Sequence, residues 1–240
     1  MELNTYPLVC TRGVVLYPNQ EIVIDVGRDN SVHAVENAQD NYDKKICLFS
    51  QKELEQENPA TEDIYSVGTL CEIRHIRRFD NFLRVKFRGI KRVKLNKWIN
   101  GSLSDLVEVE ILESEKQDTV EEEALIRMIA DELDRMQGQD RFVTKEIVME
   151  ISKGMGGEFL SDKAVQGLPL DLERKQKYLE TLGVNDRLMM LLQDMAKEKK
   201  MSEVEKQINE TVKERIDQGQ KDYYLREKMN VIREELGDTV

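Results

Sequence analysis

The sequence predicts an α+β protein in which a small, mostly antiparallel sheet comes first and helices follow. Before about residue 115, apolar residues alternate or form runs of four to eight, which is typical of strands. After Gln117 they recur every three or four residues, as in amphipathic helices. Of the 240 residues, 35% are charged, above the roughly 25% of an ordinary globular protein, and this favours long solvated helices.

Residues 1–115 are expected to form a β-rich lobe. Its strands are predicted where β-branched residues are dense, at 21–26, 45–49, 69–73, 83–87 and 106–112. Turns are expected at Pro18-Asn19, Asp80-Asn81 and Asn100-Gly101. One helix, with Ser31 as its N-cap, is predicted to interrupt the strands and to continue through Ala38. The prediction is a partly closed sheet with an inserted helix.

Residues 116–183 are expected to form a helical lobe. The first helix is marked by apolar residues from Val120 to Leu133, and Thr144 is predicted to cap a second through Ile151. After the break at 154–157, a short helix is predicted to end at Gly167, before Pro169. A last helix is predicted to begin at the N-cap Asp171 and to be ended by Gly183.

Residues 184–240 are predicted to form one long, projecting, coiled-coil-like helix. It is expected to begin with Asn185 as N-cap and to reach Leu236, about 50 residues or roughly 75 Å. Its apolar residues form a narrow stripe that needs another chain, or another part of the parent protein, to cover it. The stripe residues expected to support assembly are Ile208, Val212, Ile216, Leu225, Met229 and Ile232.

The composition indicates a cytoplasmic protein with no membrane contact. The first ten residues lack a signal-peptide pattern, and no run approaches the roughly 18 apolar residues of a membrane span. The three cysteines, Cys10, Cys47 and Cys71, are odd in number and without metal-ligand spacing. They are interpreted as small buried side chains in a reducing compartment.

We expect no catalytic, cofactor-binding or metal-binding residue in this chain. Neither His33 nor His75 has neighbours that would complete a triad or a metal site, and Cys71 and His75 would lie about 13 Å apart on a strand. The glycines at 154–157 lack the Lys-Ser/Thr ending of a phosphate-binding loop.

One segment is basic within an acidic chain of net charge −11. Residues 72–97 hold ten Lys and Arg against Glu72 and Asp80, and alternation places Arg84, Lys86 and Arg88 outward. This strand could receive acidic peptides or nucleic acid. Aromatic residues do not interleave with its cations as base stacking requires. A solvated face, or one that meets the acidic helical half, is therefore the favoured interpretation.

Methionines gather at the start of the long helix. Met189, Met190, Met195 and Met201 could adapt to varied partners, because methionine is flexible and polarisable. Core packing is the competing explanation for the same residues.

Five blocks of this sequence, in order, resemble Lon proteases. They are residues 6–18, 26–36, 64–69, 85–93, and 220–229 together with 235–237. Cys10-Thr11 stands where the family usually has Pro-Leu, and Lys228 replaces a common Gln.

The resemblance implies a PUA-like first lobe, a helical second lobe and a long helix that enters an ATPase ring. It implies a hexamer, with ATP, Mg²⁺ and a Ser–Lys peptidase dyad in modules outside this chain. The chain itself would recognise unfolded, damaged or tagged proteins and support assembly. The alternatives are a stand-alone PUA-like nucleic-acid-binding module that uses the basic strand 84–94, and a purely structural coiled-coil scaffold.

Overall fold

Six strands and a series of helices follow one another in the order that the change of sequence period predicts. The computed structural model describes residues 4–101, 104–136, 149–150 and 154–235. The strands are β1 (Asn4–Thr11), β2 (Glu21–Val26), β3 (Lys45–Ser50), β4 (Val67–Arg78), β5 (Leu83–Ile99) and β6 (Leu106–Leu112). The helices are α1 (Asp29–Asn41), the 3₁₀ turn η1 (Thr61–Asp63), α2 (Thr119–Met136), α4 (Gly157–Gly167), α5 (Leu172–Glu180) and α6 (Val184–Glu235).

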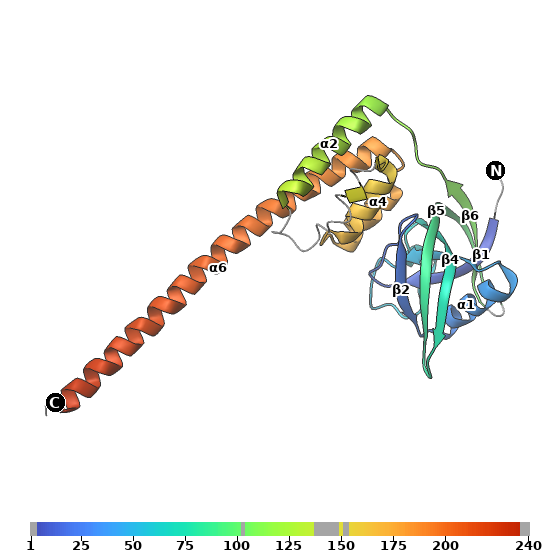
Figure 1. The fold of residues 1–240 in the computed structure, drawn as a ribbon. Coiled ribbons are helices and arrows are strands. Elements are labelled where there is room, and N and C mark those ends of the chain that lie inside the picture. Colours follow the sequence, from blue (N-terminus) through green and yellow to red (C-terminus); the bar gives the residue numbers. More distant parts are fainter. Residues whose placement is uncertain (1–3, 102–103, 137–148, 151–153, 236–240) are drawn as a thin grey trace. The chain divides into compact units, whose positions relative to one another are not determined.

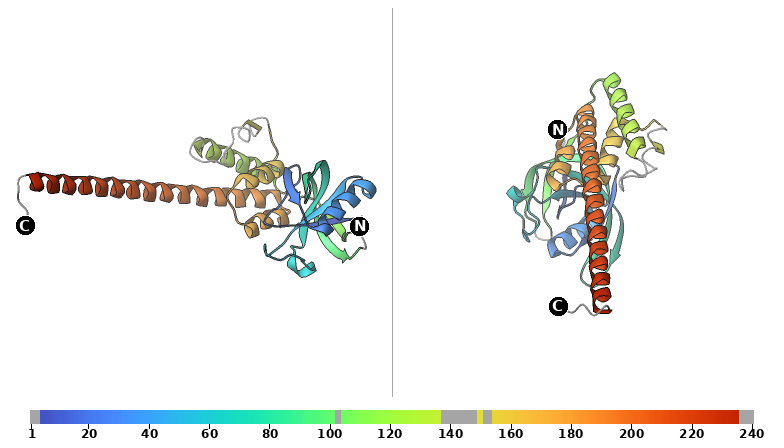
Figure 2. Two further views of the ribbon diagram at one scale, coloured as in Figure 1. Left: turned by 90° about the horizontal axis from the view of Figure 1, so that it is seen from below. Right: turned by 90° about the vertical axis from the view of Figure 1, so that its left-hand side faces the viewer.

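The chain divides into two units, residues 1–192 and 193–240. The first unit holds a β lobe, residues 4–112, and a helical lobe, residues 113–192. The second unit contains the rest of α6, which both views of Figure 2 show as one continuous helix. The change from strands to helices expected near residue 115 therefore falls inside the first unit.

The sheet is mostly antiparallel and partly closed, which confirms the prediction. Its strand order is β2-β5-β4-β3-β1-β6, with a further β5–β6 pairing, and only β1 and β3 run parallel. In Figure 1, β2, β5 and β4 lie side by side. β4 pairs with one edge of β5, so β2 and β6 share the other edge. On that edge, β2 pairs with residues 83–88 of β5, and β6 pairs with residues 92–99.

One end of the closed sheet stays open. β6 pairs with β1 only along residues 4–7, and residues 8–11 of β1 pair with β3 on their other edge. Toward this end of the sheet, β2 takes over from β6 as the neighbour of β5. Among the described strands, β2 does not pair with β1. The sheet therefore leaves an edge of β1 unpaired near the beginning of α1.

Two apolar clusters hold the β lobe together. One contains α1 residues Ala34, Val35 and Ala38 against strand residues that include Val85 and Phe87. The other fills the inside of the closed part, around Phe49, Val93 and Val109. The alternation predicted for β5 is confirmed, since Leu83, Val85 and Phe87 are buried while Arg84 and Arg88 are exposed.

The helical lobe also follows the prediction. Leu125, Ile129 and Leu133 of α2 are buried, α4 ends at Gly167, and Asp171 caps α5 by accepting a hydrogen bond from the Arg174 N–H at 2.7 Å. The helix predicted between Thr144 and Ile151 lies outside the described residues, apart from the helical pair 149–150.

Two predicted N-caps are wrong. Ser31 lies inside α1, which begins at Asp29 after Arg28. Asn185 lies inside α6, where its side-chain amide donates to the Asp118 carbonyl at 3.0 Å and to the Glu121 carboxylate at 2.8 Å. A polar side chain that could cap its own helix serves here to hold another helix. The predicted end at Leu236 lies outside the described residues, and within them no helix is long and apolar enough to cross a bilayer.

Candidate functional site

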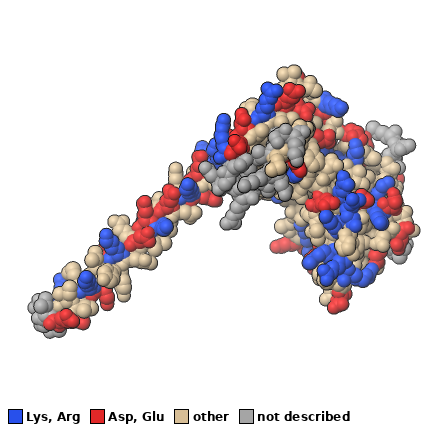
Figure 3. All heavy atoms as spheres, in the orientation of Figure 1, with Lys and Arg blue, Asp and Glu red and all other residues tan. Residues whose placement is uncertain are grey.

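The predicted basic strand lies on the surface of the β lobe, but acidic side chains accompany it. Arg84 forms a paired hydrogen bond with Asp25, with both N–O distances 2.7 Å, and Lys86 contacts Glu21 at 2.6 Å. Further ion pairs in this region are Arg74–Glu72, Arg78–Glu36 and Lys91–Glu113. Figure 3 shows Lys and Arg gathered over the β lobe with Asp and Glu beside them. Asp25 and Glu21 on β2 neutralise the charges of Arg84 and Lys86. This favours the interpretation that the basic strand forms a solvated face.

Aromatic rings do lie among these cations, contrary to the sequence prediction. Phe79 and Phe82 stack at the β4–β5 hairpin tip with ring centroids 4.7 Å apart. The guanidinium groups of Arg77 and Arg84 lie over the Phe79 ring, at 5.0 and 5.3 Å from its centroid. The rings stack on each other and under arginines of the same hairpin, so they serve the hairpin itself.

The four methionines proposed to contact partners differ in exposure. Met195 is buried, with 1% of its surface exposed, so the structure gives it a packing role. Met189 and Met201 are exposed, while Met190 is half-buried and accepts a hydrogen bond from the Thr181 hydroxyl. Core packing therefore accounts for Met195, and Met189 and Met201 remain surface candidates.

The predicted assembly residues on α6 are all exposed, but they form two faces instead of one stripe. Ile208, Val212 and Ile216 follow one another at intervals of four, while Leu225, Met229 and Ile232 come later. At 100° per residue, the two groups are centred about 130° apart around the helix axis. A straight helix thus presents two apolar faces, one on each side of Gly219.

A hollow of about 650 Å³ lies where the sheet stays open, beside the first turn of α1. We call it the α1 hollow. Its walls come from three segments, residues 8–12, 27–31 and 57–59, together with Trp98 and Asp105. A second hollow of about 340 Å³ shares Cys10, Arg12 and Arg28 with it and adds Val14 and Ile24. This size is in the range of small-ligand and peptide sites.

Two arginines lie at the α1 hollow. Arg28 donates to the carbonyls of Cys10 at 3.3 Å and Glu57 at 3.2 Å, and to the Gln51 side chain at 2.5 Å. Arg12 donates to the Gln56 carbonyl at 3.2 Å. Burial and then the nearby charge of Arg12 lower the pKa of Arg28. Burial raises the pKa of the Cys10 thiol to about 12, although Arg28 opposes the rise.

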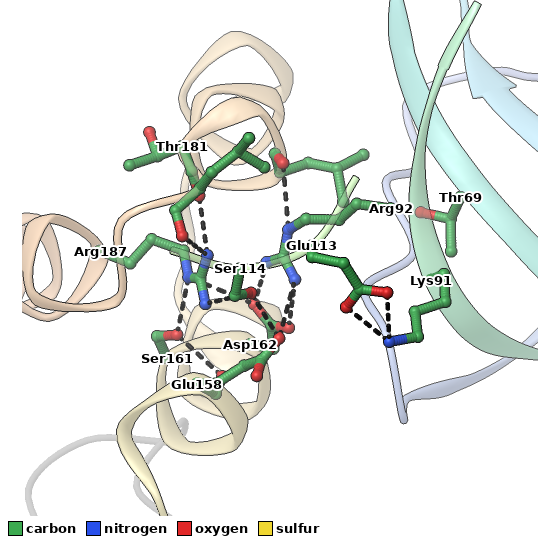
Figure 4. Close-up of polar contacts among 12 residues, drawn as sticks. Thr69, Lys91, Arg92, Glu113, Ser114, Glu158, Ser161, Asp162, Thr181 and Arg187 are labelled. Carbon is green, nitrogen blue, oxygen red and sulfur yellow. Dashed lines mark hydrogen bonds and ion pairs between the residues drawn. The ribbon is translucent and has the colours of Figure 1, made fainter. Parts of the chain in front are cut away.

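A buried junction network, Arg92–Asp162–Arg187, connects the β lobe to the helical lobe (Figure 4). Arg92 from β5 forms a paired hydrogen bond with Asp162 from α4, and Arg187 from α6 lies 3.9 Å from the same carboxylate. Arg92 also donates to the Leu179 carbonyl at 3.1 Å, and Arg187 to that of Thr181 at 2.8 Å.

Two further hydrogen bonds join the lobes. The Tyr17 hydroxyl donates to the Lys175 carbonyl, and the Gln176 amide donates to the Val67 carbonyl, each at 2.8 Å. Because buried charges are costly unless paired, Arg92 and Asp162 compensate each other's charge where the two lobes meet. Through Arg92, the basic segment therefore contacts the acidic helical half, which is one of the two interpretations favoured from the sequence.

The described residues contain no group of three or more His, Cys, Asp and Glu side chains that could hold a metal ion. His33 and His75 are both exposed, on α1 and β4 respectively. Cys47 and Cys71 are fully buried and Cys10 is half-buried, all with free thiols.

The comparison with protein families decides what kind of domain this is. Residues 5–197 match the family model described as "ATP-dependent protease La (LON) substrate-binding domain". The chain belongs to the LON substrate-binding domain family. This domain is a non-catalytic region of Lon proteases, and the matched residues run from β1 into the start of α6.

Relatives and solved structures agree with the LON family. The chain is 34% identical to Lon protease of Brevibacillus choshinensis over 97% of its length, and 33% identical to Lon protease 1 of Bacillus subtilis (strain 168) over 98%. It spans about 30% of the length of each.

Its fold is similar to the N-terminal domain of Mycobacterium avium complex Lon protease, with a TM-score of 0.65 and 19% identity over 80% of this chain and 98% of that one. It is also similar to the Lon N-terminal domain protein from Xanthomonas campestris, with a TM-score of 0.56 and 17% identity over 79% and 97%.

The α1 hollow is the feature of this LON domain that sequence reasoning missed. Its residues are up to about 100 positions apart, and only the pairing of β1, β5 and β6 brings them together. A local signal existed, because Arg12 is the first basic residue after the end of β1 and Arg28 is the first after the end of β2. Their proximity depends on register, which the sequence pattern leaves open.

Proposed function

We propose that this chain recognises unfolded, damaged or tagged proteins for a Lon-type ATP-dependent protease, and that it supports assembly of the protease into a hexamer. In this proposal the whole protein is a cytoplasmic serine endopeptidase. Its ATP, Mg²⁺ and Ser–Lys dyad would be held by modules outside residues 1–240. The observation that carries the proposal is the match of residues 5–197 to the LON substrate-binding domain.

Two features support a recognition role. The first unit has the α1 hollow on its surface, and α6 carries exposed apolar residues along its length. Weak contacts to such surfaces suit the capture of many different chains, since six copies in one ring would raise the apparent affinity without a tight single site.

Crosslinking tests recognition. The chain is mixed with a chemically denatured protein, diluted from denaturant and crosslinked, and an unrelated protein of similar net charge serves as control. We expect capture of the denatured protein well above this control and above capture of the same protein in its folded form. Equal capture by the control would refute the substrate-recognition role.

Multi-angle light scattering tests assembly. We expect the chain to self-associate with increasing concentration through the apolar faces of α6. The substitutions Ile208→Glu, Val212→Lys and Ile216→Glu should together leave a monomer. A control with Tyr224→Glu and Val231→Lys alters residues that are equally exposed but lie outside both faces. Loss of association in the control as well would argue against these faces.

The nucleic-acid alternative has a direct test. Binding by the basic strand would depend steeply on salt concentration and would be lost when Arg84, Lys86 and Arg88 become Glu. Because Asp25 and Glu21 already pair with two of these cations, we expect little binding at physiological salt.

A further inference from the structure

Two positive charges without a carboxylate partner meet at the α1 hollow. Every hydrogen bond that Arg12 and Arg28 donate ends on a neutral oxygen, and neither forms an ion pair within the part of the chain that the structure describes. By contrast, the cations Arg84, Lys86 and Lys91 each have a carboxylate partner. Guanidinium groups bind carboxylates through charge-assisted hydrogen bonds, so this pair favours one carboxylate.

An unpaired strand edge faces the same hollow. The Gln51 N–H donates to the Thr11 carbonyl on the β3 side of β1, and the Leu8 N–H donates to the Asp105 carbonyl on the opposite side. Since backbone groups alternate along a strand, the Cys10 N–H and carbonyl point to this opposite side, beyond the end of the β6 pairing. Arg28 reaches the Cys10 carbonyl from there. An extended peptide could thus meet a backbone donor next to the arginines.

Apolar walls continue on both sides of Arg28. Leu8 and Trp98 line the α1 hollow, and Val14, Ile24 and Val26 line the adjoining one. A bound peptide whose C-terminus contacts Arg28 would therefore find apolar surface for its last side chain and for the residues before it.

Acidic residues limit what else can enter. Asp29, Glu57 and Asp105 also line the α1 hollow. The side-chain amide of Asn30 donates a hydrogen bond to the Asp105 carboxylate at 2.6 Å. The arginine pair offers a place for one carboxylate, while acidic side chains elsewhere on a ligand would meet like charge.

We propose that the α1 hollow binds the C-terminal end of an extended polypeptide, with the terminal carboxylate on Arg12 and Arg28 and an apolar last side chain. The inference rests on the proposed function, because it names the part of a protein substrate that the domain recognises. An internal segment lacks the terminal carboxylate and therefore binds less tightly. Acidic residues close to the C-terminus weaken binding further.

Fluorescence anisotropy with a labelled eight-residue peptide tests the proposal. The peptide ends in Ala-Val-Leu with a free carboxylate, and its partner is the same peptide with a C-terminal carboxamide. We expect the full 240-residue chain to bind the carboxylate form about tenfold more tightly, since a charge-assisted hydrogen bond exceeds a neutral one by about that factor. Replacing the two residues before Ala-Val-Leu by Glu should weaken binding.

Arg12 provides the decisive variant. Its side chain is exposed and, within the described part of the chain, donates only to the Gln56 carbonyl, so Arg12→Ala should fold normally. We expect Arg12→Ala to remove the preference for the carboxylate form while affinity for the carboxamide form stays the same. Arg88→Ala is the matched control, because Arg88 is an exposed cation on β5 that does not line the hollow. It should keep the full preference.

The outcomes separate this inference from the proposed function. Equal affinity for both peptides, or equal effects of Arg12→Ala and Arg88→Ala, overturns the C-terminal site. If denatured proteins are still crosslinked in that case, the substrate-recognition role stands and only this site is wrong. If neither peptides nor denatured proteins bind, both proposals fail. A tenfold preference that Arg12→Ala abolishes supports both.

Discussion

Asp162 lies at the junction between the lobes and contacts one arginine from each of them. Its side chain is 2% exposed and lies between two arginines, of which Arg92 is 1% and Arg187 0% exposed. Burial raises the pKa of the Asp162 carboxyl, and the Arg92 guanidinium opposes that rise. Burial and then the charge of Arg92 lower the pKa of Arg187 to about 10. Without the carboxylate charge, two buried cations would face each other.

We therefore expect Asp162→Asn to lower the free energy of unfolding by about 3–5 kcal/mol, the range for breaking one partner of a buried ion pair. Urea denaturation followed by circular dichroism measures this. Asp25→Asn is the control, because it removes an ion pair of similar geometry at an exposed site, and it should move the urea midpoint little. Equal midpoints for the two variants would contradict the role given to Asp162.

Cys10 supplies a chemical reporter for the α1 hollow. Because burial raises the pKa of its thiol to about 12, little thiolate is present at neutral pH. We expect alkylation by iodoacetamide to be roughly a thousandfold slower than for an unperturbed thiol, and to rise about tenfold per pH unit between pH 7 and 9. Peptide mapping by mass spectrometry measures the rate.

The chain unfolded in urea is the control for Cys10, since all three thiols should then react at ordinary rates. A fast reaction at pH 7 in the folded chain, or a rate that levels off by pH 9, would contradict the high pKa. Occupation of the hollow by a peptide should slow the reaction further, because Cys10 forms part of its wall.

At the scale of elements, β5 determines the shape of the β lobe by exchanging partners along one edge. Gly89 lies between its β2-paired and β6-paired parts. The Gly89 N–H donates to the Gln20 carbonyl, and its own carbonyl accepts from the Asn19 N–H, both at 2.9 Å. A Cβ at this position would lie 2.2 Å from the Tyr17 carbonyl oxygen. The segment before β2 thus passes directly over β5.

Gly89→Ala should therefore lower the free energy of unfolding by about 1–3 kcal/mol, the usual range for forcing extra volume into a packed site. Gly219→Ala is the control, since nothing lies within 4 Å of a Cβ there and alanine favours a helix. Thermal unfolding of both variants measures the difference. A neutral Gly89→Ala would mean that the loop moves away easily, and the close approach would then be unimportant for the fold.

The strands and helices were largely predictable, because burial on one face leaves a periodic pattern in the sequence. The limits of β2 and β6 agree with the prediction, and β5 extends twelve residues past its predicted end at Phe87. Beyond that point β5 continues in β6 pairing, where a bulge between Leu95 and Lys97 disrupts the alternation. β1 is missing from the predicted strands, since Pro7 and a run of buried residues hide the period of two.

The candidate site was not predictable in the same way. The ion pairs of Arg84 with Asp25 and of Arg92 with Asp162 depend on strand register and on packing between the lobes. The sequence pattern alone therefore overstates the unpaired positive charge of the basic segment. The two N-cap errors have a related origin. Asn185 has the right chemistry for a cap, but tertiary contacts with Asp118 and Glu121 use its side chain instead.

At the scale of the whole molecule, the two units differ in what stabilises them. The first unit has two apolar clusters and the junction network. In the second, every described residue from Glu203 onward is exposed. Helices in water gain most of their stability from packing, and long helices without it remain marginal. We infer that residues 203–235 become a stable helix mainly when their apolar faces are covered.

Hydrogen–deuterium exchange at two protein concentrations tests this inference. In dilute solution, amides of residues 203–235 should exchange far faster than those of β4 and β5, because local opening there exposes no buried apolar surface. At a concentration where light scattering detects association, the same amides should become protected. The Ile208→Glu, Val212→Lys and Ile216→Glu variant should exchange fast at both concentrations. Slow exchange of residues 203–235 in a proven monomer would show that the helix is stable alone, and assembly would then contribute nothing to its folding.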